Sequence, residues 1–84
     1  MERESQYTIS SVKTALKVLK LFDSAHKSMT LTENTERADM RKGTMVRVLT
    51  TQEEEGFVRY DEISKRYSLG MSIYVLSSNA FQFI

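Results

Sequence analysis

The sequence predicts a mostly helical domain that carries one small β-hairpin, and three observations point to it. A short helical segment leads into a tight turn at residues 39–40, and a second helical segment opens on Arg41. This second segment keeps its apolar side chains on one side and stops at Gly56. Residues 57–60 and 66–69 are rich in valine, tyrosine and leucine and are typical of paired strands. The expected fold class is a winged helix-turn-helix of three helices and a two-stranded wing, followed by a C-terminal helix.

Size and composition exclude several classes of protein. The chain has 84 residues, a net charge of +1 and no cysteine. It is therefore one domain near the lower size limit for burying a core, with neither disulfides nor a thiolate metal site. No apolar run approaches the ~20 residues that a membrane span requires, and the polar first six residues are no signal peptide. We expect a soluble, cytoplasmic protein with no membrane partner.

The charges are segregated along the chain. Basic residues gather within 13–20, 41–47 and 65–66, whereas acidic residues gather at 53–55 and 61–62. A local basic surface attracts phosphates even on a nearly neutral protein. The distribution gives weak support to DNA binding.

The first helix follows residues 1–9, which show no periodic pattern and are expected to form a flexible N-terminal arm. Ser10 or Ser11 is expected to cap it, because a serine hydroxyl accepts from the free amides of the first turn. Its apolar residues repeat at helical spacing and predict a buried stripe. The stripe comprises Val12, Ala15, Leu16, Leu19 and Phe22, widened by Val18 and Leu21. Residues 23–28 are expected to be a polar connection.

The second helix has two possible starts. Thr30 and Glu33 fit a capping box, in which each side chain accepts from a backbone amide of the other residue. The register of the motif instead favours Thr32 as the cap. Leu31 and Ala38 are expected to face inward.

Two polar residues interrupt the apolar pattern of the helices. Asn34 and Gln52 both stand where an apolar side chain is expected. Asp39 occupies the turn between the second and third helices, where a left-handed backbone suits glycine best and aspartate is one of the few alternatives.

The third helix is expected to span about 41–55, or ~20 Å. Its buried side is predicted to consist of Met45, Val48, Leu49 and Gln52, with Gly43, Arg47 and Thr50 on the opposite side. Gly43 costs about 1 kcal/mol of helix propensity relative to alanine. It also lets the helix backbone approach a phosphate or a base closely. Both interpretations remain open.

The end of the chain is unusually apolar. The two predicted strands are joined by a turn at residues 61–66, and a further helix is expected from Ser72 to Ala80, packed on the first helix of this chain or of a partner. Apolar side chains continue to Ile84. We expect a homodimer through the first helix and this tail, because a monomer would leave an apolar patch in water.

These segments together resemble the N-terminal domain of the IclR (isocitrate lyase regulator) family of transcription factors. The resemblance covers roughly residues 10–76. It is carried by residues 11–22, 31–33, 42–49, 54–58 and 66–70. The Glu-Gly-Phe-Val step into the wing, followed by Arg-Tyr-x-Leu-Gly, is fairly specific in this combination.

The resemblance implies a division of the chain and a set of partners. The division is an arm at 1–9, a DNA-binding domain at 10–70 and a linker helix with tail at 71–84. Family members normally continue into an effector-binding domain, which we expect to be absent, so no small-molecule effector is expected for this fragment. Family members bind palindromic operators as homodimers or dimers of dimers.

Five positions depart from the family pattern. Asn34 and Gln52 replace leucine or isoleucine, Asp39 replaces glycine, Arg41 replaces proline, and Gly43 replaces a serine suited to a phosphate contact. These changes bear on stability and on docking more than on the fold.

The amino end of the third helix is expected to enter the major groove. Arg47 is the leading candidate for a base contact, because a guanidinium grips guanine O6 and N7 together, worth ~1–3 kcal/mol. Contact with phosphate or solvent is the alternative. Arg41 and Lys42 are expected to clamp phosphates, helped by the positive end of the helix dipole.

Further contacts are expected around this centre. Gly43 allows close approach, and Thr32 is placed to donate to a phosphate. Lys65 and Arg66 are expected to follow the minor groove or the backbone from the wing. Thr44, Val46 and Thr50 are expected to meet base edges or a thymine methyl.

The sequence shows no catalytic, cofactor or metal site. His26 has no companion at ligand spacing, and the glutamates at 53–55 have no pocket that would tune them for acid–base chemistry. The alternative function is a winged-helix module for protein–protein interaction or dimerisation without DNA binding, since a fold alone does not fix function.

Overall fold

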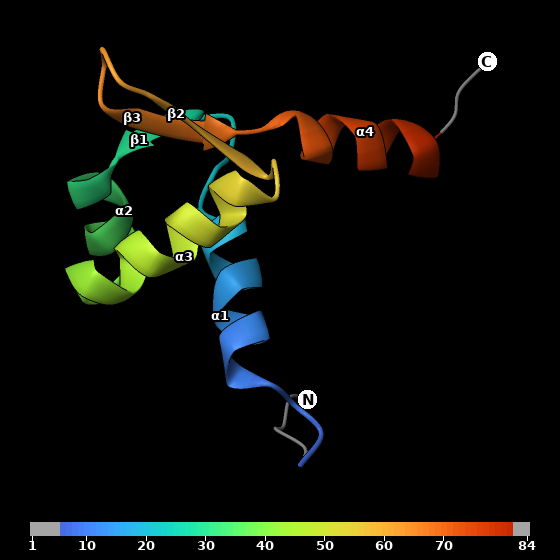
Figure 1. Cartoon of the computed structure of the whole chain (residues 1–84), viewed down its shortest axis with the longest axis horizontal. Coiled ribbons are helices and arrows are strands. Elements are labelled where there is room, and N and C mark those ends of the chain that lie inside the picture. Colours follow the sequence, from blue (N-terminus) through green and yellow to red (C-terminus); the bar gives the residue numbers. More distant parts are fainter. Residues whose placement is uncertain (1–5, 82–84) are drawn as a thin grey trace.

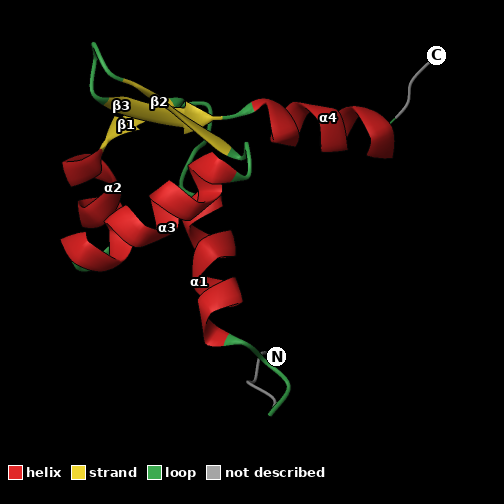
Figure 2. Cartoon of the chain, viewed as in Figure 1, coloured by secondary structure: helices red, strands yellow, loops and turns green. Residues whose placement is uncertain are grey.

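The computed structural model describes residues 6–81, where the chain forms four helices and a three-stranded antiparallel sheet (Figure 1, Figure 2). In chain order, the elements are α1 (Ser10–Leu19), β1 (Ser28–Thr30), α2 (Leu31–Ala38), α3 (Lys42–Glu54), β2 (Val58–Asp61), β3 (Arg66–Leu69) and α4 (Met71–Ala80). This is the winged helix-turn-helix that the sequence predicts. Residues 1–5 of the predicted arm and 82–84 of the tail lie outside the described residues.

The sheet has one strand more than expected. The strand order is β1-β3-β2, so the predicted hairpin is confirmed and β1 pairs with its second strand. Met29 faces Tyr67 across this added pairing and is 1% exposed. The polar connection predicted for 23–28 therefore ends one residue too late, because Ser28 already belongs to β1. A strand of three residues is too short to show a periodic pattern.

The core is built around α3. Met45 and Leu49 are both 0% exposed, and Val48 packs against them from the edge. The buried residues around them come from α1, the loop after it, β1 and β2. They are Val18, Phe22, Met29 and Val58. The predicted buried side of the third helix is confirmed, and its burial supplies the main apolar driving force of the fold.

The first helix differs from the expectation in three ways. Ile9 is its N-cap and no side chain caps it, so a cap at Ser10 or Ser11 was wrong. The helix ends at Leu19, which leaves Phe22 in the following loop. Val12 and Leu16 are 51% and 53% exposed rather than buried. Figure 1 shows why, since the amino-terminal half of α1 projects away from the other elements.

The start and end of α2 follow local rules. Thr30 Oγ1 accepts from the Glu33 amide at 3.1 Å, and Glu33 Oε1 accepts from the Thr30 amide at 2.9 Å. This is the predicted capping box, and the alternative start at Thr32 was wrong. Asp39 ends the helix in the left-handed region at φ 53°, ψ 52°, as the sequence predicts.

Two glycines form the joint between the wing and α4. Gly56 has φ 80°, and a Cβ on Gly70 would collide with the Gly56 carbonyl oxygen. That oxygen accepts from the Ser72 amide at 3.0 Å, and Ser72 Oγ donates to the Glu55 carbonyl at 3.0 Å. The first turn of α4 is thereby tied to the end of α3.

Beyond this joint, α4 extends away from the domain (Figure 1). None of its residues is buried, and it does not pack along α1 of the same chain. The predicted packing on the first helix of this chain was therefore wrong. Within residues 6–81, no helix is both long and apolar enough to cross a membrane.

Asn34 and Gln52, the two polar residues at positions where apolar side chains are expected, are both buried. Asn34 Nδ2 donates to the Thr30 carbonyl at 3.0 Å, and Gln52 Nε2 donates to the Ala15 carbonyl on α1 at 2.6 Å. The amide oxygens of both side chains are buried without a hydrogen-bond partner among the described residues. A buried acceptor without a partner costs about 1–3 kcal/mol.

We predict that Gln52→Leu raises the free energy of unfolding by about 1 kcal/mol, because it removes an unpaired buried oxygen. An open groove of about 510 Å³ beside Gln52 leaves room for the added volume. Urea unfolding followed by circular dichroism measures the change. Leu49→Ala is the calibrating variant and should lower stability by about 2–5 kcal/mol. A loss of stability in Gln52→Leu would mean that the bond to the Ala15 carbonyl outweighs the unpaired oxygen.

Candidate nucleic-acid interface

The exposed side of α3 lies opposite the core. Successive residues of a helix are rotated by about 100°, so burial of Met45 and Leu49 turns Gly43, Arg47 and Thr50 outward. All three are exposed in the structure, as the sequence predicts. Val46, on one flank, is 38% exposed.

The amino end of α3 is strongly basic. Arg41 is the N-cap with an extended backbone, φ −69° and ψ 145°, and its carbonyl accepts from the Met45 amide at 3.0 Å. No side chain of the described residues caps the helix, and its first turn contains no acidic residue. Arg41, Lys42 and Arg47 are all exposed. The free amides and positive charges together form a site suited to an anion.

The carboxyl end of α3 has the opposite charge. Glu53, Glu54 and Glu55 are consecutive and exposed. They would repel phosphates and, lying at the negative end of the helix dipole, they are not neutralised by it. The helix is therefore electrostatically polar, and a nucleic acid would approach its amino end.

Gly43 is open to solvent on the basic end of the helix. A Cβ built at this position meets no heavy atom within 4 Å. The fold itself therefore does not require glycine here. Of the two interpretations of this residue, close approach by a ligand is the one for which the packing leaves room.

A groove of about 510 Å³ separates α3 from α1. Thr44 and Arg47 line it from α3, and Val12 and Leu16 line it from α1. Arg47 thus stands at the border between the outer side of α3 and this groove. On the neighbouring helix, Thr32 is exposed in the first turn of α2, where its carbonyl accepts from Thr35 Oγ1 at 2.7 Å.

The turn of the wing carries a mixed set of charges. Lys65 is exposed and has a left-handed backbone at φ 63°, and its amide donates to the Asp61 carbonyl at 2.7 Å. The Ile63 amide donates to Asp61 Oδ1 at 3.0 Å, and this bond, with a further one from Ser64, lowers the pKa of Asp61 below its ordinary value. Asp61 is therefore ionised at neutral pH beside Glu62.

Arg66 is bound within the fold. Its Nε donates to Ser28 Oγ at 2.9 Å, and its Nη2 donates to the Ser28 carbonyl and to Glu33 Oε1, each at 3.0 Å. Sequence reasoning placed this side chain on DNA. The structure lays it across β1 and the start of α2 with its side chain 38% exposed, and its predicted contact with DNA stays untested.

The sequence did not predict a further set of polar contacts, which is centred on Arg37. Arg37 Nη2 on α2 donates to the Leu21 carbonyl at 3.2 Å and to Asp23 Oδ2 at 3.3 Å, and His26 Nε2 lies 3.3 Å from Arg37 Nη1. The hydrogen bond from the His26 side chain is the main reason that the pKa of Asp23 is lowered. The partners of Arg37 lie 11 to 16 residues away along the chain, so the sequence contains no periodic pattern that would predict these contacts.

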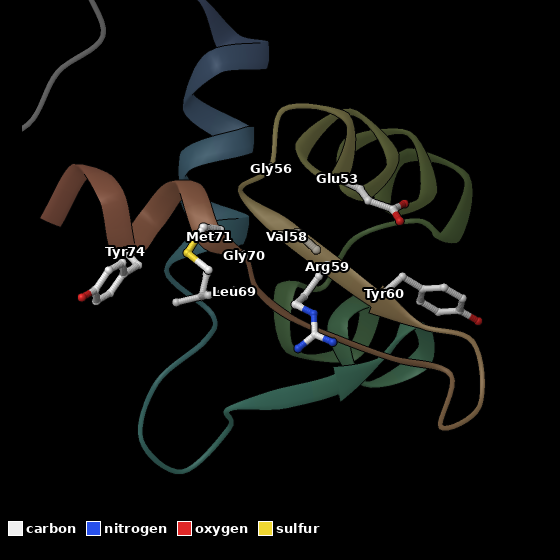
Figure 3. A pocket seen from close by; sticks show the side chains of 9 residues that line it. All are labelled: Glu53, Gly56, Val58, Arg59, Tyr60, Leu69, Gly70, Met71 and Tyr74. Carbon is white, nitrogen blue, oxygen red and sulfur yellow. The ribbon is translucent and has the colours of Figure 1, made fainter. Parts of the chain in front are cut away.

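A larger hollow of about 780 Å³ lies between the end of α3, the sheet and α4 (Figure 3). Met71 and Tyr74 of α4 stand at one side of it, and Glu53 and Tyr60 stand at the other. Arg59 points into the space between them. Within the described part of the chain, no three histidine, aspartate or glutamate side chains gather as metal ligands would.

Comparison with known proteins agrees with this geometry. A family model described as the IclR helix-turn-helix domain matches residues 11–62. No curated protein sequence matches the chain. Among solved structures, an IclR transcriptional regulator from Alicyclobacillus acidocaldarius superposes with a TM-score of 0.84 and 44% identity, covering 90% of this chain and 31% of that protein.

Two more distant structures have the same fold. One is a putative IclR regulator from Silicibacter, with a TM-score of 0.76, 28% identity and coverage of 83% and 27% of the two chains. The other is a putative IclR-family regulator from Rhodococcus, with a TM-score of 0.77, 27% identity and coverage of 95% and 32%. This chain thus spans about a third of the length of these proteins. On the match of its helix-turn-helix domain and on these structural neighbours, the chain belongs to the IclR family of transcriptional regulators.

Proposed function

We propose that the chain binds a DNA operator sequence-specifically, with the amino end of α3 in the major groove. The observation that carries the proposal is the joint exposure of Arg41, Lys42 and Arg47 at a helix start that no described side chain caps and whose first turn holds no acidic residue. Such a helix end attracts phosphates through both its dipole and its side chains. The exposed side of α3 then meets base edges.

Roles within the interface follow from position. Arg47 lies on the exposed side of α3, at its border with the groove, and reads a base, whereas Arg41 and Lys42 at the helix start bind phosphates. Thr44, Val46 and Thr50 border Arg47 and contact neighbouring base edges or a methyl group. Thr32 donates to a phosphate from the first turn of α2.

The wing contributes less than α3. Its turn, residues 61–66, carries Asp61 and Glu62 against one unpaired cation, Lys65, because the charge of Arg66 faces Glu33. Two carboxylates against one ammonium group disfavour deep entry into the minor groove, where the potential is negative. Lys65 therefore makes one peripheral contact with the backbone.

A homodimer matches a palindromic operator by symmetry. The surface that we assign to dimerisation is the exposed apolar part of α1 and α4, which we call the dimer surface. It consists of Ile9, Val12, Leu16, Met71, Tyr74, Val75 and Leu76, each 46–70% exposed. Exposed apolar side chains on two projecting helices favour burial against a second copy.

The alternative is a module for protein–protein interaction. The hollow beside α4, lined by the apolar side chains of Leu69, Met71 and Tyr74 and by Arg59, is the observation that favours it. The two functions separate experimentally, because a pure interaction module has no affinity for duplex DNA and still self-associates.

We predict that Arg47→Ala lowers affinity for the selected operator by about 10–100-fold, and that base preference at one position is lost. Lys42→Ala should weaken binding to all sequences and reduce the slope of log K against log salt by about 0.9. Mobility-shift titrations at several salt concentrations, with an operator selected from a random pool, measure both. Arg59→Ala, on the α4 side, is the control with the same loss of charge. Equal affinities for wild type and the two α3 variants would refute this docking.

Gly43→Ala separates stability from DNA affinity. It should raise the free energy of unfolding by about 0.5–1 kcal/mol, because alanine is the better helix former and the added methyl meets no atom. Affinity for the operator should fall, because the methyl keeps the helix away from the duplex. Unfolding and titration of the same preparation test both effects. Unchanged affinity would assign Gly43 no role at the DNA.

Sedimentation equilibrium tests the dimer surface. We predict a wild-type dimer, and weakening of self-association by at least about tenfold in Leu16→Glu and in Leu76→Glu, because a buried unpaired charge is costly. Ile63→Glu is the matched control, since Ile63 is 93% exposed on the turn of the wing, away from this surface. A wild-type monomer at high concentration would rule the surface out.

A further inference from the structure

Arg66 connects three segments that are far apart in the sequence. It opens β3, where it pairs with Thr30 of β1 on one side and with Asp61 of β2 on the other. Its guanidinium reaches past this pairing to the Ser28 side chain and carbonyl, 38 residues away, and to Glu33, 33 residues away. Nε and Nη2 both bind Ser28 on β1, and Nη2 also reaches Glu33 in the first turn of α2.

Glu33 receives two bonds on one oxygen. Its Oε1 accepts from the Thr30 amide at 2.9 Å as part of the capping box, and from Arg66 Nη2 at 3.0 Å. The start of α2 and the start of β3 therefore share a single carboxylate oxygen. We call this set of residues, Ser28, Thr30, Glu33 and Arg66, the wing clamp.

The clamp matters because the apolar anchoring of α2 consists of Leu31 and Ala38, which pack against the core but are only partly buried. The helix is eight residues long, and its only buried side chain is the polar Asn34. Hydrogen bonds hold both of its ends: the wing clamp at the start, and Arg37 near the end through the Leu21 carbonyl and Asp23. Since α2 packs on α3, the clamp links the wing to the helix that carries Arg47.

We propose that Arg66 is a positioning residue of the DNA interface, which sets the angle between the wing and the α2–α3 pair and makes no phosphate contact itself. This inference rests on the proposed DNA binding. The planar fork of the guanidinium is essential, because a lysine ammonium group is a point charge that cannot span Ser28 and Glu33 in the same geometry.

The test compares Arg66→Lys, which keeps the charge, with Glu33→Ala, which removes the acceptor. A positioning role predicts that both variants lose about tenfold in operator affinity, with the slope of log K against log salt unchanged. The double variant should lose no more than either single variant, because the two residues act as one unit. Lys65→Asn is the neighbouring control: it removes a charge, suits the left-handed backbone, and should reduce the salt slope by about 0.9 if Lys65 meets a phosphate.

Direct phosphate contact predicts the opposite pattern. Arg66→Lys would then retain its affinity, and Glu33→Ala would bind DNA more tightly, because a negative charge near the duplex is gone. Either result would overturn the positioning role. Amide hydrogen exchange at Thr30 and Glu33 provides a readout without DNA, and it should be faster in Arg66→Lys than in Lys65→Asn. Equal exchange in the two variants would also overturn the clamp.

The outcomes keep this inference separate from the proposed function. If the wild-type chain binds no duplex while exchange shows the clamp, DNA binding fails and the positioning role fails with it. If wild type binds and Arg66→Lys binds equally well, only the positioning role fails. Circular dichroism at the temperature of the titration verifies that each variant is folded.

Discussion

Burial of one side of α3 is the constraint on which the rest of the structure depends. Met45 and Leu49 have no exposed surface, and they contact side chains from α1, β1 and β2. Rotating α3 about its axis would bring these side chains into water and take Arg47 into the core, which the free energy of apolar burial and of charge desolvation both oppose. The core therefore fixes which side of the helix faces outward, and the candidate interface is a consequence of packing.

Polar interactions complete what apolar burial leaves undetermined. Within residues 6–81, neither Asn34 nor Gln52 satisfies its amide oxygen, so we expect both to lower the stability that leucine or isoleucine would provide. Their amide groups still link α2 to the preceding strand and α3 to α1. The orientation of α2 is set by hydrogen bonds at its two ends together with Leu31 and Ala38, which pack against the core without being fully buried.

The charged residues of α3 are segregated along the length of the helix. The amino end of α3 gathers exposed arginine and lysine, whereas its carboxyl end gathers three glutamates. The turn of the wing adds little positive potential, because Arg66 faces Glu33 and hydrogen bonds from Ile63 and Ser64 lower the pKa of Asp61. In a chain with a net charge of only +1, this separation makes the amino end of α3 the end of that helix that favours an anion.

The sequence by itself determined the elements that depend on neighbours along the chain. Helical spacing gave the buried side of α3, and the capping pair Thr30 and Glu33, the left-handed Asp39 and the glycine after α3 were all readable locally. What only the tertiary structure decided depends on partners distant in the chain. β1 is a strand only because β3 lies beside it. On α1, Val12 and Leu16 are exposed because the core of the domain covers only the carboxyl-terminal part of this helix. The partners of Arg66 and Arg37 likewise required the fold, because local patterns carry no information about contacts between residues that are far apart in the sequence.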